Sequence, residues 1–139
     1  MREIVFRRRD DGLDLWLPVE PVPASRPRVT RWGVYYGKRY TAFRKEVSEI
    51  LGRTDLPKGL PLLGRLKVYA SFFVLKPRTS IREWPNGDLD NYLKTLDVFN
   101  GILWKDDDQI VEFEAVKRFV HSPVEGISDP GIQLLILQK

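Results

Sequence analysis

The chain has 139 residues, 42% of them hydrophobic, and a formal net charge of +4. That length and apolar content are enough for one domain with a hydrophobic core. The absence of cysteine excludes disulfides and thiolate metal sites. His121 is the only histidine, so zinc sites with several His or Cys ligands and Ser–His or Cys–His catalytic sets are disfavoured. We expect His121 to be a surface residue.

The N-terminal arginines, Arg2 and residues 7–9, are not followed by an apolar run. This pattern is not typical of a signal peptide. No apolar stretch approaches the length of a membrane span. The sequence therefore predicts a cytoplasmic protein without a membrane partner.

The first half of the chain is expected to hold one strand, one hairpin and one helix. Residues 1–12 are expected to form a flexible basic tail, and alternating apolar residues predict a strand over 13–17. Four prolines predict an extended loop over 18–27. A hairpin is expected over 34–40 around Gly37. After it, apolar residues at helical spacing predict a helix that ends near Gly52.

The second half is expected to hold three strands and one helix. Residues 66–75 are apolar on both faces, which favours a central strand covered on both sides. A helix is expected from Asp90, its N-cap, to Asn100, followed by strands over 110–120 and 132–137. This order predicts an α+β (mixed α/β) fold over residues 1–139. We expect a single small domain, with a mixed sheet of about four strands packed with two main helices.

The positive charge is concentrated near the N-terminus. Residues 1–45 contain eleven Lys and Arg against five Asp and Glu, whereas the remainder contains twelve against fourteen. Between residues 24 and 45, cations are interleaved with Trp32 and several tyrosines. Cations neutralise phosphates and aromatic rings stack on unpaired bases, so this segment is predicted to bind nucleic acid. The alternative is that the tyrosines form a hairpin core and the cations only solubilise the surface.

Six aspartates lie between Gly87 and Gln109, in a chain that is otherwise basic. Asp88 and Asp90 are two residues apart, so in an extended backbone both carboxylates face the same way. Lys94 lies one helical turn beyond Asp90, and a short return loop is expected to bring Asp107 over the start of the helix. Carboxylates are the ligands that Mg²⁺ prefers. The sequence therefore predicts a metal-dependent nuclease in which three carboxylates converge on one or two ions.

Each part of this pattern also has a purely structural interpretation. Asp90 can be a helix cap, Asp90 with Lys94 an ordinary i,i+4 pair, and residues 106–108 a solvated turn. An EF-hand that begins at Asp88 is excluded, because Tyr92 and Phe99 occupy positions that require oxygen ligands. Neither a phosphate-binding P-loop nor a dinucleotide fingerprint is present.

Two segments, residues 87–94 (GDLDNYLK) and 104–111 (WKDDDQIV), together with the Arg-Pro-Arg of residues 26–28, resemble the RusA-type Holliday junction resolvases, many of them carried by prophages. The resemblance implies a homodimeric α/β endonuclease that binds four-way, branched DNA. It also implies symmetric nicking of two opposed strands with Mg²⁺, for which Mn²⁺ can substitute, and no small-molecule cofactor. Two alternatives stay open: a DNA-binding module without catalysis, and a related nuclease acting on flaps or forks.

The resemblance assigns roles to individual residues. Asp88, Asp90 and Asp107 match the metal carboxylates, and Lys94 matches the essential lysine. The run of three aspartates also permits Asp106 or Asp108 in place of Asp107. The expected contacts with DNA are Arg26, Arg28, Arg31, Lys38, Arg39, Lys76, Arg78 and Asn91.

Overall fold

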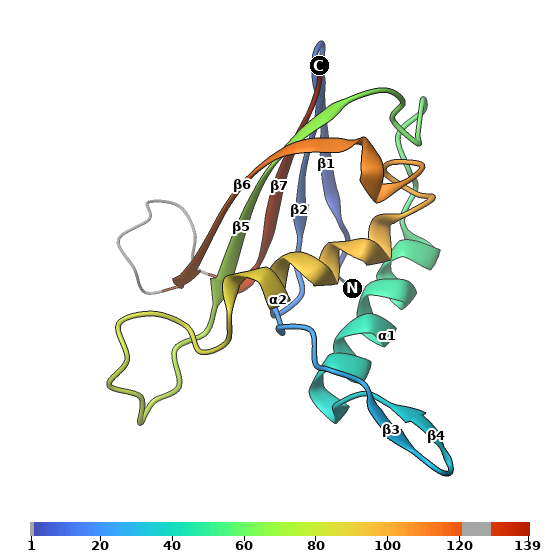
Figure 1. The fold of residues 1–139 in the computed structure, drawn as a ribbon. Helices are drawn as coiled ribbons and strands as arrows, with labels where there is room; N and C mark the ends of the chain where they lie inside the picture. The colour runs from blue at the N-terminus through green and yellow to red at the C-terminus, as the bar shows by residue number, and fades with distance from the viewer. Residues whose placement is uncertain (1, 121–128) are drawn as a thin grey trace.

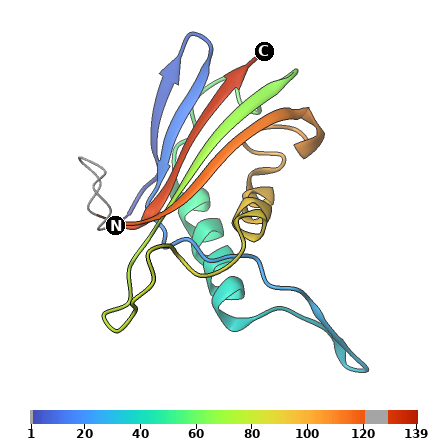
Figure 2. The same cartoon turned by 60° about the vertical axis from the view of Figure 1, so that its left-hand side comes forward.

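The computed structural model describes residues 2–120 and 129–139. Five strands form one sheet in the order β1-β2-β7-β5-β6, and β3 and β4 form a separate two-stranded ribbon that projects from the body (Figures 1 and 2). Only β5 and β6 pair in parallel. The strands are β1 (Val5–Arg9), β2 (Gly12–Leu17), β3 (Arg28–Thr30), β4 (Gly33–Tyr35), β5 (Leu66–Val74), β6 (Ile110–Phe119) and β7 (Gly131–Gln138).

The helices lie together on one face of the sheet (Figure 1). Helix α1 spans Lys38–Arg53, and α2 spans Leu89–Lys94 and continues directly into the 3₁₀ helix η1, Thr95–Phe99. Parallel neighbours need a crossover connection, and α2 with η1 provides it between β5 and β6. The two segments that resemble the resolvases therefore belong to one crossover unit.

The core lies between the helices and the facing side of the sheet. Alternate residues of β5, from Leu66 to Phe72, are buried against the helices, and the Phe72 ring lies 5.5 Å from the ring of Tyr92 in α2. Helix α1 contributes a buried stripe at the spacing expected of an amphipathic helix: Tyr40, Phe43, Val47 and Ile50.

The opposite face of β5 is less apolar than predicted. Phe73 is buried there beside Trp16, with the ring centroids 6.0 Å apart. Further along, Lys67 forms ion pairs with Glu112 and Glu114 of β6, and Leu75 is exposed. The prediction of a strand covered on both sides is therefore correct only near Phe73.

The α+β fold, both main helices and the strands over 13–17, 66–75, 110–120 and 132–137 are confirmed to within a few residues. The prediction of a flexible basic tail over residues 1–12 is wrong. Val5–Arg9 pairs with β2 and adds a fifth strand at the edge of the sheet. Charged side chains are tolerated on such a strand because one of its edges faces solvent.

The hairpin predicted around Gly37 is misplaced. The ribbon turns at Arg31 and Trp32, between β3 and β4, and Gly37 is instead the N-cap of α1. Gly33 has a φ of +136°, which a glycine adopts without strain, so the turn forms there. Lys38 and Arg39 consequently lie in the first turn of the helix.

The second predicted helix begins two residues earlier than expected. Asp88 is its N-cap, and Asp90 lies in the first turn. The α-helical part ends at Lys94, where the Thr95 hydroxyl donates to the Tyr92 carbonyl at 2.6 Å. Local hydrogen bonds of this kind compete with regular helix geometry. His121 and residues 122–128 lie outside the described part.

No helix within residues 2–120 and 129–139 is both long and apolar enough to span a bilayer.

Candidate active site

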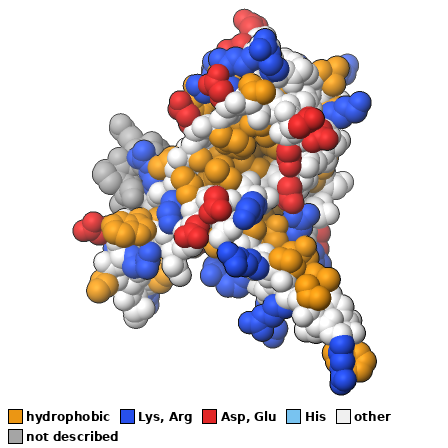
Figure 3. All heavy atoms as spheres, viewed as in Figure 1, with side chains coloured by type: hydrophobic (Ala, Val, Ile, Leu, Met, Phe, Trp, Pro, Cys, Tyr) orange, Lys and Arg blue, Asp and Glu red, His pale blue; other side chains and the backbone are white. Residues whose placement is uncertain are grey.

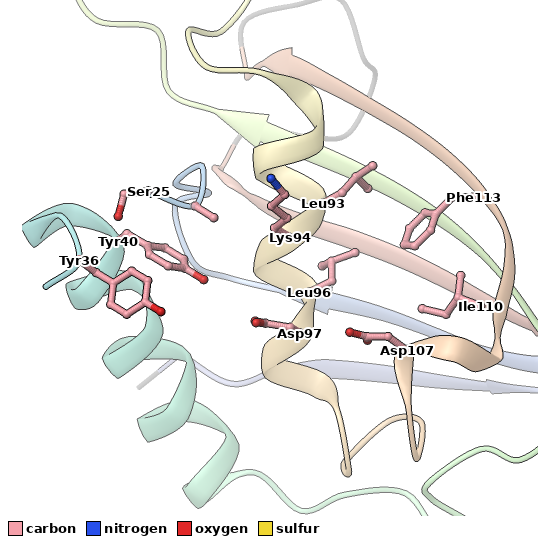
Figure 4. Close-up of a pocket in the computed structure, with 11 residues that line it drawn as sticks. Ser25, Tyr36, Tyr40, Leu93, Lys94, Leu96, Asp97, Asp107, Ile110 and Phe113 are labelled. Atoms are coloured by element: carbon pink, nitrogen blue, oxygen red, sulfur yellow. The ribbon is translucent and has the colours of Figure 1, made fainter. Parts of the chain in front are cut away.

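A cleft of about 590 Å³ runs between the crossover helices and β6, and the root of the ribbon borders it. Figure 3 shows hydrophobic side chains in the hollow beside β6, with acidic and basic side chains close together around it. The close-up in Figure 4 shows Lys94, Asp97 and Asp107 among its lining residues. The others are Ala24, Ser25, Tyr36, Tyr40, Leu93, Leu96, Ile110 and Phe113.

Asp107 is held in place by two donors. The indole N–H of Trp104 lies 2.9 Å from its Oδ1, and the side-chain amide of Asn100 lies 3.0 Å from its Oδ2. The same indole N–H also reaches Asn100 Oδ1 at 2.7 Å. Trp104 is completely buried. The orientation of Asp107 is therefore fixed from the core.

The two neighbouring aspartates have different surroundings. Asp106 caps a short 3₁₀ turn, Asp107–Gln109, and its carboxylate accepts from the backbone N–H of Asp108 at 3.1 Å. The Gln109 side chain binds the backbone N–H groups of Lys105 and Asp106 and the carbonyls of Leu62 and Gly64. Of the three aspartates, only Asp107 lines the cleft that contains Lys94.

Asp88, Asp90 and Asn91 lie at the start of the crossover helix, next to the cleft. The Lys94 ammonium lies 3.8 Å from Asp90 Oδ2 and 3.4 Å from Asn91 Oδ1, so the expected i,i+4 neighbours do meet. The pair is exposed, which limits its contribution to stability to a few tenths of a kcal/mol. Asp88 makes no capping hydrogen bond with its side chain. Asp90 lies inside the first turn, so its interpretation as the helix cap is wrong.

The return loop brings Asp107 to a different part of the helix than expected. Its bond to Asn100 places it by the far end of η1 rather than over the start of α2. Among residues 2–120 and 129–139, no three Asp, Glu, His or Cys side chains are grouped so as to hold a metal ion. The available donors are carboxylate oxygens, which match the chemistry of Mg²⁺.

Asp97 is a lining residue to which the sequence assigned no role. Figure 4 shows its carboxylate and that of Asp107 directed toward the same side of the cleft. Arg44 binds Asp97 at 2.8 Å and the Tyr40 hydroxyl at 3.0 Å. Partial burial acts to lower the pKa of Arg44, but these two hydrogen bonds outweigh it and raise that pKa. Lys94 and Asp97 are one helical turn apart, and this spacing was the sequence pattern that could have placed Asp97 in the site.

Apart from Asn91 in α2, the predicted DNA contacts lie on two exposed segments, and the first of them borders the cleft. One is the ribbon and its flanks, which carry Arg26, Arg28, Arg31, Lys38 and Arg39, all exposed. The other is the loop between β5 and α2, which carries Lys76 and Arg78. The ammonium of Lys76 lies 5.6 Å from the centre of the Phe119 ring.

The family model for the endodeoxyribonuclease RusA matches residues 18–128. The chain belongs to the RusA endodeoxyribonuclease family. The match includes the ribbon, α1, the crossover helix and both aspartate segments. No curated protein matches the chain closely.

Membership of the RusA family confirms the resemblance found in the sequence. The family consists of endonucleases that act on branched DNA. The cleft supplies the polar groups expected of such an enzyme: carboxylates, one lysine and a basic border. The sequence did not predict the roles of Asn100, Trp104 and Arg44. Asn100 and Trp104 reach Asp107 only because the chain turns back between η1 and β6, and Arg44 reaches Asp97 from a distant helix.

Proposed function

We propose that this protein is a Mg²⁺-dependent endonuclease that resolves four-way DNA junctions by paired, symmetric nicks in the cytoplasm. The observation that carries the proposal is the position of Asp107. It is fixed by Trp104 and Asn100 in the same cleft as Lys94, at the edge of a basic surface. Membership of the RusA family supports the reaction class.

Asp88, Asp90 and Asp107 would hold the metal, together with substrate. Mg²⁺ commonly uses one or two carboxylates and completes its shell with water and phosphate oxygens. Three grouped carboxylates are therefore not required in the free protein. A bound Mg²⁺ would activate a water molecule and neutralise charge on the scissile phosphate.

The remaining groups bind and orient the DNA. The Lys94 ammonium is exposed at the cleft and bears a positive charge suited to a phosphate that gains negative charge during cleavage. Asn100 and Trp104 keep Asp107 in one orientation, so that it need not reorganise when DNA binds. The cations of the ribbon and of the loop after β5 hold the flanking phosphates.

Symmetric cutting requires two sites. Each chain offers one such cleft among its described residues, whereas a four-way junction has two equivalent scissile phosphates related by two-fold symmetry. A homodimer with C2 symmetry meets this requirement and is the commonest closed assembly.

The test compares nicking of a synthetic four-way junction, a fork, a flap and a linear duplex, with Mg²⁺, with Mn²⁺ and with EDTA. We expect paired nicks in the junction with either metal and none with EDTA. Light scattering should give about twice the chain mass of 16.2 kDa. Binding without cleavage would support the binding-module alternative. If a monomer cleaves flaps or forks as fast as junctions or faster, the result would support the alternative of a related nuclease that acts on flaps or forks.

A further inference from the structure

The β3–β4 ribbon places an unpacked tryptophan at its end. Trp32 is 75% exposed, and Val29 in the adjoining strand is 80% exposed. Figures 1 and 2 both show the ribbon standing away from the sheet and the helices. Val34 and Tyr35 of the same ribbon, and Tyr36 next to it, are also more than half exposed. Apolar side chains that are exposed together in this way mark an interaction surface.

The turn holds Trp32 in a defined position. The backbone N–H of Trp32 donates to Thr30 Oγ1 at 3.1 Å, and the Tyr35 hydroxyl donates to the Trp32 carbonyl at 3.3 Å. Thr30 Oγ1 also donates to the Gly33 carbonyl at 3.3 Å. The Arg31 guanidinium lies 4.8 Å from the centre of the Trp32 ring. The tip therefore combines a flat ring with a positive charge, which are the two groups that bind unpaired nucleotides.

The root of the ribbon is tied to the helix that carries the proposed catalytic residues. The backbone N–H of Ala24 donates to the Asn91 carbonyl at 2.8 Å. At the other strand, the Gly37 N–H donates to Ser25 Oγ at 2.9 Å. Both ends of the ribbon thus meet beside the cleft, where Ser25 and Tyr36 are lining residues.

The charge along the ribbon fits DNA. From residue 21 to residue 45 the sequence has no acidic residue, and the cations of this stretch include Arg26, Arg28 and Arg31, all exposed. A basic strand pair with one aromatic tip matches a single phosphate backbone with an unpaired base more closely than it matches a protein surface. The centre of a branched DNA molecule is where stacking is interrupted and bases are accessible.

We propose that the Arg31–Trp32 tip stacks on an unpaired base at the branch point and so fixes the distance from the branch to the cut. This rests on the proposed function, whose site it deepens. The seven steps from one residue to the next between Ser25 and Trp32 span at most roughly 23 Å, at about 3.3 Å per extended residue. At about 3.4 Å per nucleotide along each strand, the cut lies within about seven nucleotides of the branch.

The test is binding in EDTA, where no cleavage is needed, to a four-way junction and to a duplex of the same length. Base stacking on an aromatic side chain corresponds to about 5- to 150-fold in affinity. We expect Trp32→Ala to weaken junction binding by that factor and duplex binding by less than about twofold. Trp32→Tyr should restore most of the affinity. Val29→Ala, another exposed apolar residue of the ribbon, is the control and should bind as the wild type does.

A second readout is permanganate oxidation of thymines placed at the branch. We expect the wild-type protein to change their reactivity and Trp32→Ala to leave it as in free DNA. Equal behaviour of Trp32→Ala and Val29→Ala in both assays would overturn the inference. A change of Trp32→Ala from dimer to monomer would overturn it too, since the tip would then contact protein.

These outcomes are separable from those for the proposed function. Wild-type protein that nicks junctions normally, with no effect of Trp32→Ala, removes the ribbon proposal alone. Loss of junction preference in Trp32→Ala, with no nicking by the wild type under any metal, removes the nuclease proposal alone.

Discussion

The indole N–H of Trp104 donates to the carboxylate of Asp107 at 2.9 Å, so a fully buried ring positions an exposed acidic group. The tryptophan belongs to the hydrophobic core through its ring, which lies 6.1 Å from that of Phe99. Its single polar atom reaches the rim of the cleft. Core packing and the geometry of the site are therefore coupled at one residue.

Replacement of Trp104 by Phe keeps much of the apolar contact and removes the N–H donor. We expect nicking of the junction to slow by about 10- to 100-fold, since displacement of a catalytic group by about 1 Å has effects of that size. Stability should fall by about 1–3 kcal/mol, because the smaller ring leaves a cavity. Single-turnover nicking and urea denaturation measure the two effects.

Asn100→Ala, at an exposed position, should slow nicking with a stability loss below about 1 kcal/mol. Wild-type rates in both variants would contradict the role given to these donors.

The assignment within the run of three aspartates is tested by three Asn variants. Asp107→Asn should lower the nicking rate by at least about 100-fold and leave junction binding intact, since loss of a negative charge does not weaken attraction to phosphate. Asp108→Asn should be close to wild type. Asp106→Asn should behave likewise, because Asn is also a good N-cap. Loss of activity in Asp106→Asn or Asp108→Asn, with Asp107→Asn active, would move the assignment to that residue.

Removal of a cation that contacts a phosphate lowers the salt dependence of DNA binding. For Arg26, Arg28, Arg31, Lys38 and Arg39, each Ala variant should reduce the slope of log affinity against log salt by about one unit. The comparison is Lys45→Ala, on the exposed face of α1, where the cation already pairs with Glu49 at 4.0 Å. A triple variant at Arg26, Arg28 and Arg31 with an unchanged slope would return these residues to a solubilising role.

Glu20 gives a prediction about pH. Burial raises its pKa above the ordinary 4.5, although the Leu75 N–H on its other oxygen acts against this. Its buried Oε2 has no hydrogen-bond partner among the described residues. The native state therefore binds this proton more tightly than the unfolded state does. Stability is lost as pH rises from about 4.5 through the raised pKa, and stays low above it.

The substitution Glu20→Gln removes the ionisable carboxyl group and with it the loss of stability at higher pH. The variant should match the wild type near pH 4 and exceed it at pH 7, as measured by urea denaturation at both values. Glu49→Gln, on the exposed face of α1, is the control and should show no such growth with pH. A Glu20→Gln protein that is less stable than wild type at pH 7 would disprove the argument.

The parts of this fold that follow from local pattern were predictable. The stripe from Phe43 to Ile50 identifies α1, and the spacing of Asp90 and Lys94 gives neighbours on one helix face. Strand β1 was missed because its residues are mostly charged, and only pairing with β2 reveals it. Such an edge strand has no periodic apolar signal to detect.

The side-chain contacts that organise the site depend on how the chain turns, and the apolar pattern of the sequence did not reveal them. Asn100 was interpreted only as a helix end, although its amide binds Asp107. Arg44 lies in the segment of residues 24–45 that was predicted to bind nucleic acid, but it pairs with Asp97, far along the chain. The hairpin was predicted at the wrong position because Gly37 and Gly33 are both plausible turn residues. The hydrogen bonds at Thr30 and Trp32 favour the turn beside Gly33.

The strand order also has a consequence for the protein during its synthesis. Strand β7 lies between β2 and β5, at the centre of the sheet, but among the described strands of this sheet it is the last in chain order. Until it is made, β1 and β2 have no partner that joins them to the crossover unit with the site. A nascent chain thus carries the basic ribbon and all of the aspartates before it has the sheet that arranges them. We therefore expect the proposed cutting of DNA to require β7.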